Sequence, residues 1–210
     1  MTTNTILTRW WWVRHAPVTD HGGRLYGRTN VPANTSERPR FEGLARALPQ
    51  DAVWLTSNLL RTHQTADAIA EAGHAVPERV IEPDLDEQDF GAWHGLTWSE
   101  VASERGSGLA HKYWVAPAHI TPPEGESFVQ VVERVADAVT RRTAQHAGQD
   151  IVAVAHGGSI RAALALALGL DAERALAFSI DNLSITCIDH VDGPAKGQAW
   201  RVAAVNLPPD

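Results

Sequence analysis

Three short apolar stretches of this 210-residue chain each end in a polar cluster. They are Arg9–Val13, Ala52–Thr56 and Ile151–Ala155, and each has the length and the aromatic or β-branched content of a buried strand. Stretches with helical patterns follow, so strands and helices alternate along the chain. This alternation predicts an α/β fold, a three-layer α/β/α sandwich around a mostly parallel central sheet.

The remaining segments complete this prediction. Helices are expected over Glu37–Leu48, from Ser57 through Ala70, over Thr97–Ser103, over Ser127–Gln145 and from Gly157 to Leu168, and two late strands over Leu183–Ile188 and Trp200–Val205. Glycines and prolines mark residues 17–40 as a long loop. We expect a single domain spanning residues 1–210, with an irregular lid or insertion at about 82–125.

The polar clusters that follow the three strands are expected to meet. Arg14 and His15 follow the first strand, Ser57 and then Arg61 follow the second, and His156–Gly158 follows the third. Parallel strands bring their carboxyl ends to one edge of a sheet, where ligands of such folds bind. A cationic pocket, or bowl, suited to a phosphate group would result. It would contain two guanidiniums, two imidazoles and the glycine amides at a helix N-terminus.

Phosphoryl transfer at such a bowl needs a nucleophile and a proton donor. A neutral imidazole is a competent nucleophile near pH 7. The donor is expected to be a carboxylic acid in the irregular segment. Spacing does not choose among the candidates, which are Glu82, Asp84, Asp86, Glu87 and Asp89.

Composition narrows the class of partner. The net charge of −7 argues against broad binding of nucleic acid or of an anionic membrane. No stretch approaches the roughly 20 apolar residues of a membrane span, and no signal peptide is recognisable, so a cytoplasmic location is expected. The expected partner is a small phosphorylated metabolite or inorganic phosphate, and a homodimer is a possible assembly. The single cysteine, Cys187, excludes an intrachain disulfide and is expected to be buried rather than reactive.

The ten histidines raise the alternative of a metal site. The chain contains no H-E-x-x-H or C-x-x-C motif and no histidine cluster at ligand spacing, so we expect no metal and no cofactor.

A series of motifs, in order, resembles the histidine phosphatase superfamily, which includes the cofactor-dependent phosphoglycerate mutases. The motifs are Val13–Ala16, Gly23–Arg28, Ser57–Ala66, Leu85–Gly95, Gly125–Ser127, Ala155–Gly158 and Trp200–Asn206. This resemblance covers nearly the whole chain and implies a phosphoglycerate mutase-like fold that works without a metal.

The resemblance also implies roles for individual residues. His15 would accept the phosphoryl group, and Glu87 would act as general acid and then as general base. Arg14, Arg61 and His156 would hold the phosphoryl oxygens, with Gly157 as a further phosphate contact. His21, Tyr26 and Ser57 are candidates for substrate binding. Two positions depart from the family pattern: Ala16 replaces the motif glycine and adds a methyl near the phosphate pocket, and His21 stands where many members carry Asn.

The resemblance leaves three activities open. Mutases of this superfamily usually carry paired arginines after the acid, whereas the cations between Glu100 and Gly125 are Arg105 and Lys112. This favours a phosphatase over a mutase. The third alternative is a non-catalytic phosphate-binding protein, which the presence of all the implied chemical residues disfavours. Trp93, Trp98 and Trp114 either wall the pocket against an apolar substrate part or belong to the core.

Overall fold

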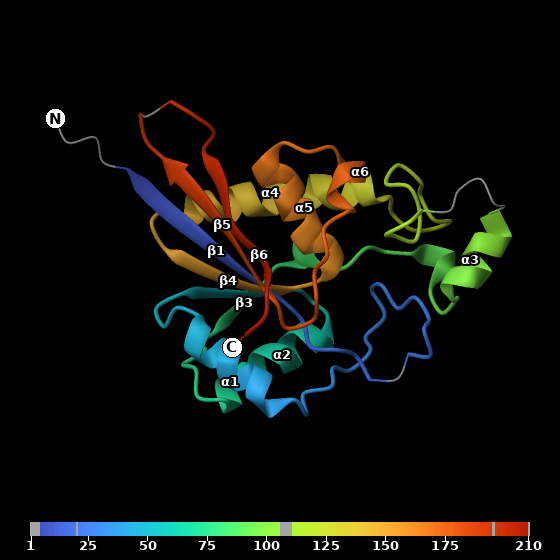
Figure 1. The fold of residues 1–210 in the computed structure, drawn as a ribbon, viewed down its shortest axis with the longest axis horizontal. Coiled ribbons are helices and arrows are strands. Elements are labelled where there is room, and N and C mark those ends of the chain that lie inside the picture. Colours follow the sequence, from blue (N-terminus) through green and yellow to red (C-terminus); the bar gives the residue numbers. More distant parts are fainter. Residues whose placement is uncertain (1–4, 20, 106–110, 195, 210) are drawn as a thin grey trace.

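The computed structural model describes residues 5–19, 21–105, 111–194 and 196–209. Six strands form one sheet in the order β3-β2-β4-β1-β5-β6 (Figure 1). The strands are β1 Ile6–Arg14, β2 Val53–Thr56, β3 Arg79–Ile81, β4 Asp150–Ala155, β5 Ile185–Asp192 and β6 Trp200–Leu207. The first four strands of that order pair in parallel, and β5 and β6 pair antiparallel. The predicted mostly parallel sheet is therefore confirmed.

Helices cover both faces of the sheet, as predicted for a three-layer sandwich. In Figure 1, α1 and α2 lie on one face and α4, α5 and α6 on the other, while α3 projects from one end of the molecule. The helices are α1 Arg38–Ala47, α2 Leu60–Glu71, α3 Trp98–Arg105, α4 Phe128–Gln145, α5 Gly157–Leu168 and α6 Ala172–Ala175, with short 3₁₀ turns at Pro83–Leu85 and Gly91–Trp93.

The run of three tryptophans in β1 is explained by burial on both faces. Trp10 and Trp12 stack with ring centroids 5.0 Å apart and belong to the core cluster that includes residues of α4 and α5. Trp11 packs against the other cluster, to which α1 and α2 contribute. Successive side chains of a strand point to opposite faces, so only a central strand accommodates such a run.

Local sequence signals set several helix boundaries. The hydroxyl of Ser127 accepts a hydrogen bond from the amide of Gln130, and the Gln130 side chain accepts one from the Ser127 amide, so a capping box starts α4 where it was predicted. The expectation that the second helix begins at Ser57 is wrong, because α2 begins at Leu60. The Asn58 amide instead donates to Asp86, which holds this part of the chain in an extended turn.

Two short elements, β3 and α6, were not predicted. Cys187 is buried, as expected, and burial raises the pKa of its thiol to about 11. Among the described residues, no helix is both long and apolar enough to cross a membrane.

Candidate active site

The clusters that follow β1, β2 and β4 lie together because these strands are neighbours in the sheet. Arg14 at the end of β1 is paired in register with Ala155 at the end of β4. The amide of His15 donates to the Ala155 carbonyl at 2.9 Å. The rings of His15 and His156 consequently lie 5.1 Å apart between centroids. Two residues 141 positions apart in the sequence thus face each other at the carboxyl edge of the sheet, as predicted.

His15 is held as a neutral imidazole with a defined tautomer. Its side chain is 1% exposed, and its Nδ1 lies 2.6 Å from the carbonyl oxygen of Ala16. A carbonyl only accepts, so Nδ1 carries the hydrogen and the lone pair of the neutral ring is on Nε2. Burial, together with the charges of Arg61 and Arg14, holds the pKa of His15 well below its usual value. Nε2 is therefore available as a nucleophile at neutral pH.

His156 is fully buried beside it and is supported from behind. Its Nε2 lies 2.8 Å from the hydroxyl of Ser57, and that hydroxyl accepts a hydrogen bond from the Leu59 amide at 3.1 Å. Burial, then the charge of Arg61, lowers the pKa of His156 well below its usual value. Ser57, a candidate for substrate binding by resemblance, is fully buried and contacts this imidazole.

Two arginines are fixed by backbone carbonyls around the histidines. Arg14 donates from Nη1 to the carbonyl of Ile180 at 2.5 Å. Arg61 donates to the carbonyls of Gly27 and Thr29 at 2.6 and 2.9 Å, and its guanidinium stacks on Tyr26 at 5.0 Å from the ring centroid. These contacts anchor both side chains by their outer nitrogens.

Three buried nitrogens of this cluster have no hydrogen-bond partner. They are Nε of Arg14, Nε of Arg61 and Nδ1 of His156. Most buried polar atoms in proteins are paired, because an unpaired one costs on the order of 1–3 kcal/mol. Three such atoms in one cationic cluster indicate a site built to receive hydrogen-bond acceptors, as an anion supplies.

The contacts of the five candidate acids distinguish them from one another. Four of them are engaged in contacts that fix the chain or balance a cation. The partners are Arg141 and Arg142 for Glu82, Arg141 for Asp84, the Asn58 amide for Asp86 and the Gly91 amide for Asp89.

Glu87 is the one of these five that lines the cavity beside the histidines. Its Oε1 accepts from the amides of Gln88 at 3.0 Å and Gly158 at 3.1 Å. A Cβ on Gly158 would lie 2.2 Å from this oxygen, so the glycine permits the close approach. The Gly158 amide, expected from the sequence to face the anion, instead holds this carboxyl group. Gly157 lies against Arg14, with its would-be Cβ 3.6 Å from the Arg14 Nε.

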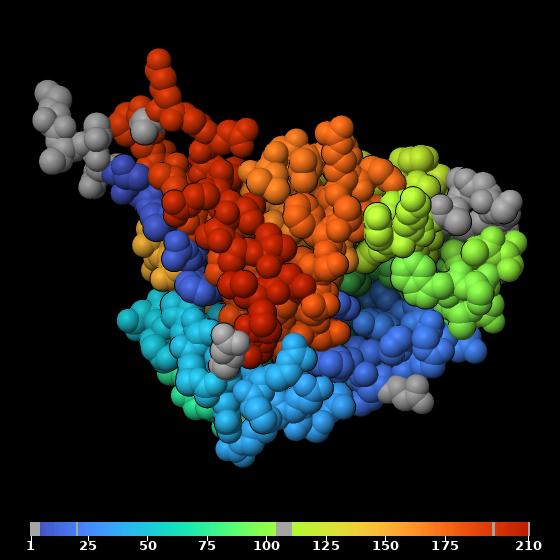
Figure 2. Space-filling view, in the orientation of Figure 1, coloured from blue at the N-terminus to red at the C-terminus, as the bar shows by residue number. Residues whose placement is uncertain are grey.

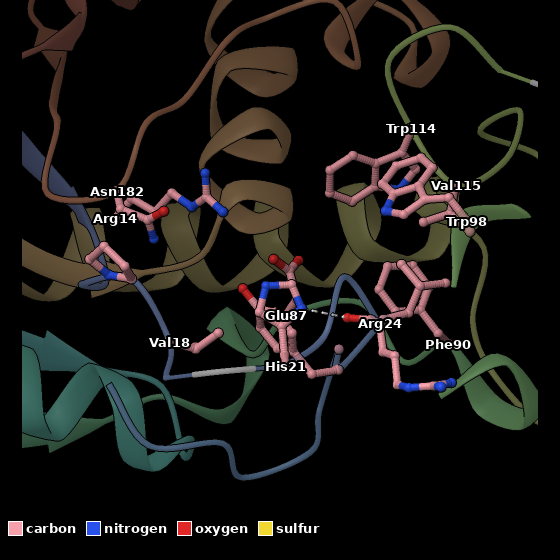
Figure 3. Close-up of a pocket in the computed structure, with 14 residues that line it drawn as sticks. Arg14, Val18, His21, Arg24, Glu87, Phe90, Trp98, Trp114, Val115 and Asn182 are labelled. Atoms are coloured by element: carbon pink, nitrogen blue, oxygen red, sulfur yellow. Dashed lines mark hydrogen bonds between the residues drawn. The ribbon is translucent and has the colours of Figure 1, made fainter. Parts of the chain in front are cut away.

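A cavity of about 300 Å³ opens above this cluster (Figure 3). Arg14 and Glu87 line this cavity, whereas His15, His156 and Arg61 each expose at most 1% of their surface to solvent. In the space-filling view of Figure 2, the blue N-terminal loop, the green segment around α3 and the orange segment around α5 surround the hollow. The described residues hold no group of three or more His, Cys, Asp or Glu that could bind a metal ion.

The other predicted site residues lie at different depths. His21 and Tyr26 line the cavity, and their rings are 5.1 Å apart. Ala16, which follows His15, is buried and belongs to the core cluster that contains Phe41 and Leu44. Lys112 is exposed, and the side chain of Arg105 lies outside the described part of the chain.

The three tryptophans that were expected either at the pocket or in the core differ in their positions. Trp98 and Trp114 line the cavity, while Trp93 is 4% exposed and belongs to a small core with Leu25 and Phe90. Asn182 is a polar cavity residue that sequence reasoning missed; its side-chain amide donates to the His15 carbonyl at 2.8 Å. It lies in a loop just before β5, where no motif or periodicity marks it.

Known proteins share this sequence pattern and fold. The sequence model of the histidine phosphatase superfamily (branch 1) matches residues 10–203. A metal-independent phosphoserine phosphatase of Arabidopsis thaliana is 31% identical over 155 residues, which are 71% of this chain and 64% of that protein. An adenosylcobalamin/alpha-ribazole phosphatase of Salmonella typhimurium is 27% identical over 205 residues, covering 95% of this chain and 99% of that one.

The solved structure of the mycobacterial glucosyl-3-phosphoglycerate phosphatase superposes with a TM-score of 0.78 at 25% identity, covering 96% of this chain and 99% of that one. Other relatives, among them a bifunctional protein of Mycobacterium tuberculosis, are 40% identical over 117 residues, and the match spans only 31% of their own length. The family match covers nearly all of the chain and includes every element that carries the site. This chain belongs to the histidine phosphatase superfamily.

Proposed function

We propose that this protein is a metal-independent phosphomonoesterase that hydrolyses a small phosphorylated metabolite through a phosphohistidine at His15. The observation that carries the proposal is the set of three unpaired buried nitrogens around that imidazole. A phosphoryl group offers oxygens to Nε of Arg14, Nε of Arg61 and Nδ1 of His156, which balances three otherwise costly desolvated groups.

In the first step, Nε2 of His15 attacks phosphorus while the bond from phosphorus to the ester oxygen breaks. Charge on the phosphoryl oxygens is balanced by the two guanidiniums. The departing alcohol oxygen takes a proton from the carboxyl group of Glu87, which lies at the cavity surface where a leaving group would sit.

In the second step, water replaces the alcohol. The Glu87 carboxylate accepts a proton as the water oxygen attacks phosphorus, and the bond from phosphorus to Nε2 breaks. Inorganic phosphate leaves, and both His15 and Glu87 return to their starting protonation states. The Gly158 amide keeps the carboxyl group in place during both steps.

The relatives named phosphatases support hydrolysis over the alternatives left open by the sequence. A mutase would return the phosphoryl group to a second hydroxyl, and a binding protein would not use Glu87 at all. A phosphatase releases inorganic phosphate, a mutase forms an isomeric phosphate ester and a binding protein forms no product, so a product analysis separates the three.

The test is turnover of p-nitrophenyl phosphate by the purified protein in the presence of EDTA. We expect release of inorganic phosphate, loss of the rate in His15→Ala and an acid-labile phosphate adduct on His15 after rapid quenching. His119→Ala, which removes an exposed histidine, is the matched control and keeps the rate. Formation of 2-phosphoglycerate from 3-phosphoglycerate and 2,3-bisphosphoglycerate, without free phosphate, would establish a mutase instead.

A further inference from the structure

The cavity has two chemically different ends. Arg14 lies at one end, and Glu87 lies between it and the aromatic residues (Figure 3). The other end is formed by Phe90, Trp98 and Trp114, with Leu25 and Val115 also lining the cavity. Figure 3 shows the aromatic side chains grouped together, away from Arg14 and Asn182.

Trp114 is held rigidly in this wall. Its indole Nε1 donates to Oε1 of Gln88 at 2.7 Å, and the guanidinium of Arg161 stacks on its ring at 4.9 Å from the centroid. The ring of Phe90 lies 6.3 Å away. A wall that is already ordered loses little conformational entropy when a ligand packs against it.

Trp98 supplies exposed aromatic surface beside that fixed wall. It lies at the start of α3 and is 49% exposed, although it lines the cavity. A large apolar side chain left half in water gains free energy when a ligand covers it. The two indoles therefore favour a ligand with an apolar face.

The charged groups at this end are already balanced. Arg24, which lines the cavity, donates to the Gly95 carbonyl at 2.7 Å and lies 3.5 Å from the carboxylate of Glu100. Among the described residues, the acid that lines the cavity is Glu87, which the proposed function uses as the proton donor. The arginine at the aromatic wall, Arg24, is therefore already paired, and the wall itself favours an apolar group.

We infer that the preferred substrate is a phosphate monoester whose alcohol part carries a flat apolar group, such as an aromatic ring, packed against Trp98 and Trp114. For the phosphate end this rests on the proposed function. The cavity volume of about 300 Å³ is at the small end of ligand sites, which accommodates one or two rings beside the phosphate. Small zwitterionic or carboxylated phosphate esters lack the apolar face and gain nothing from this wall.

Binding of two phosphonates tests the inference without requiring turnover. Benzylphosphonate and methylphosphonate share the phosphate-like head and differ in the ring, and neither can be hydrolysed. By titration calorimetry we expect benzylphosphonate to bind at least about tenfold more tightly than methylphosphonate. Trp98→Ala should remove most of that difference while leaving methylphosphonate binding unchanged.

Tyr113→Ala is the matched control, because Tyr113 is a 61% exposed aromatic residue that does not line the cavity. It should keep the full preference. Equal affinity for the two phosphonates in the unmodified protein, or a preference that survives in Trp98→Ala, would overturn the inference. A protein that prefers benzylphosphonate but turns over no phosphomonoester would refute the proposed function and leave the apolar wall in place.

Discussion

The hydroxyl of Ser57 lies 2.8 Å from Nε2 of His156 and receives a hydrogen bond from the Leu59 amide. The amide can only donate, so it uses one lone pair of the hydroxyl, and the Thr62 hydroxyl lies 3.3 Å away as a second neighbour. We expect the Ser57 hydroxyl to donate to Nε2, which would leave the hydrogen of the neutral ring on Nδ1, the atom that lacks a partner. On this expectation Ser57 is a positioning residue that sets which nitrogen of His156 donates to a bound phosphoryl group.

Removing that hydroxyl should weaken phosphate binding without removing the nucleophile. We expect Ser57→Ala to raise the Kd of inorganic phosphate about tenfold, the cost of one buried hydrogen bond, and Ser57→Thr to restore part of it. Calorimetric titration with phosphate measures the effect. Unchanged affinity in Ser57→Ala would show that Ser57 does not control the tautomer.

Replacing the proton donor should affect substrates according to their leaving groups. In Glu87→Gln, hydrolysis of an alkyl phosphate should fall by about 10²–10⁴-fold, the usual contribution of a general acid. p-Nitrophenyl phosphate should be affected much less in the phosphorylation step, because its leaving group needs no proton. Burst kinetics separate that step from dephosphorylation. Equal slowing of phosphorylation for both substrates would contradict the role of Glu87.

The two buried imidazoles should make stability depend on pH. Their pKa values are lowered in the folded protein, chiefly by burial, while in the unfolded chain they return to the ordinary 6.5. Below about pH 6.5 the unfolded chain binds protons that the folded protein does not. The free energy of unfolding therefore decreases as the pH is lowered, by up to about 1.4 kcal/mol per pH unit for each histidine. Urea unfolding at about pH 7.5 and about pH 5.5 should show this loss. The loss should be smaller in His15→Gln, and an identical loss there would rule out His15 as a source.

Arg61 both faces the anion site and ties down the loop that carries Gly27 and Thr29. We expect Arg61→Ala to weaken phosphate binding by on the order of 2 kcal/mol and to increase proteolysis within that loop. Arg38→Ala is the control, because Arg38 is an exposed arginine paired with Glu42 on a helix surface. If the loop in Arg61→Ala is as resistant to proteolysis as in the unmodified protein, Arg61 does not anchor it.

The sequence predicted the parts of the fold that depend on strong local patterns. The apolar stretches before His15 and His156 identified central strands, and their parallel pairing then placed both imidazoles at one edge. β3 escaped prediction because it is a three-residue edge strand whose residues are partly or fully exposed, which leaves little apolar pattern to detect. α6 is a single turn of four residues, too short for helical periodicity to be visible.

The sequence allowed us to predict which types of residue form the site, but not which contacts each of them makes. Five acids within eight positions could not be separated by spacing, since their roles depend on partners such as Arg141, Arg142 and Gly158 that are distant in the sequence. Asn182 and the stacking of Arg161 on Trp114 were invisible for the same reason. The family resemblance assigned Glu87, and among the five acids it is the one that lines the cavity.

The central position of β1 has a consequence for how the polypeptide is made. Its two neighbours, β4 and β5, come from the C-terminal half of the chain, so the strand with three consecutive tryptophans emerges from the ribosome long before either partner exists. At ordinary rates of translation this interval is on the order of ten seconds. Throughout it, an aromatic strand that is apolar on both faces remains unpaired along both edges. Until β4 has been synthesised, β1 therefore has no native partner strand on either edge.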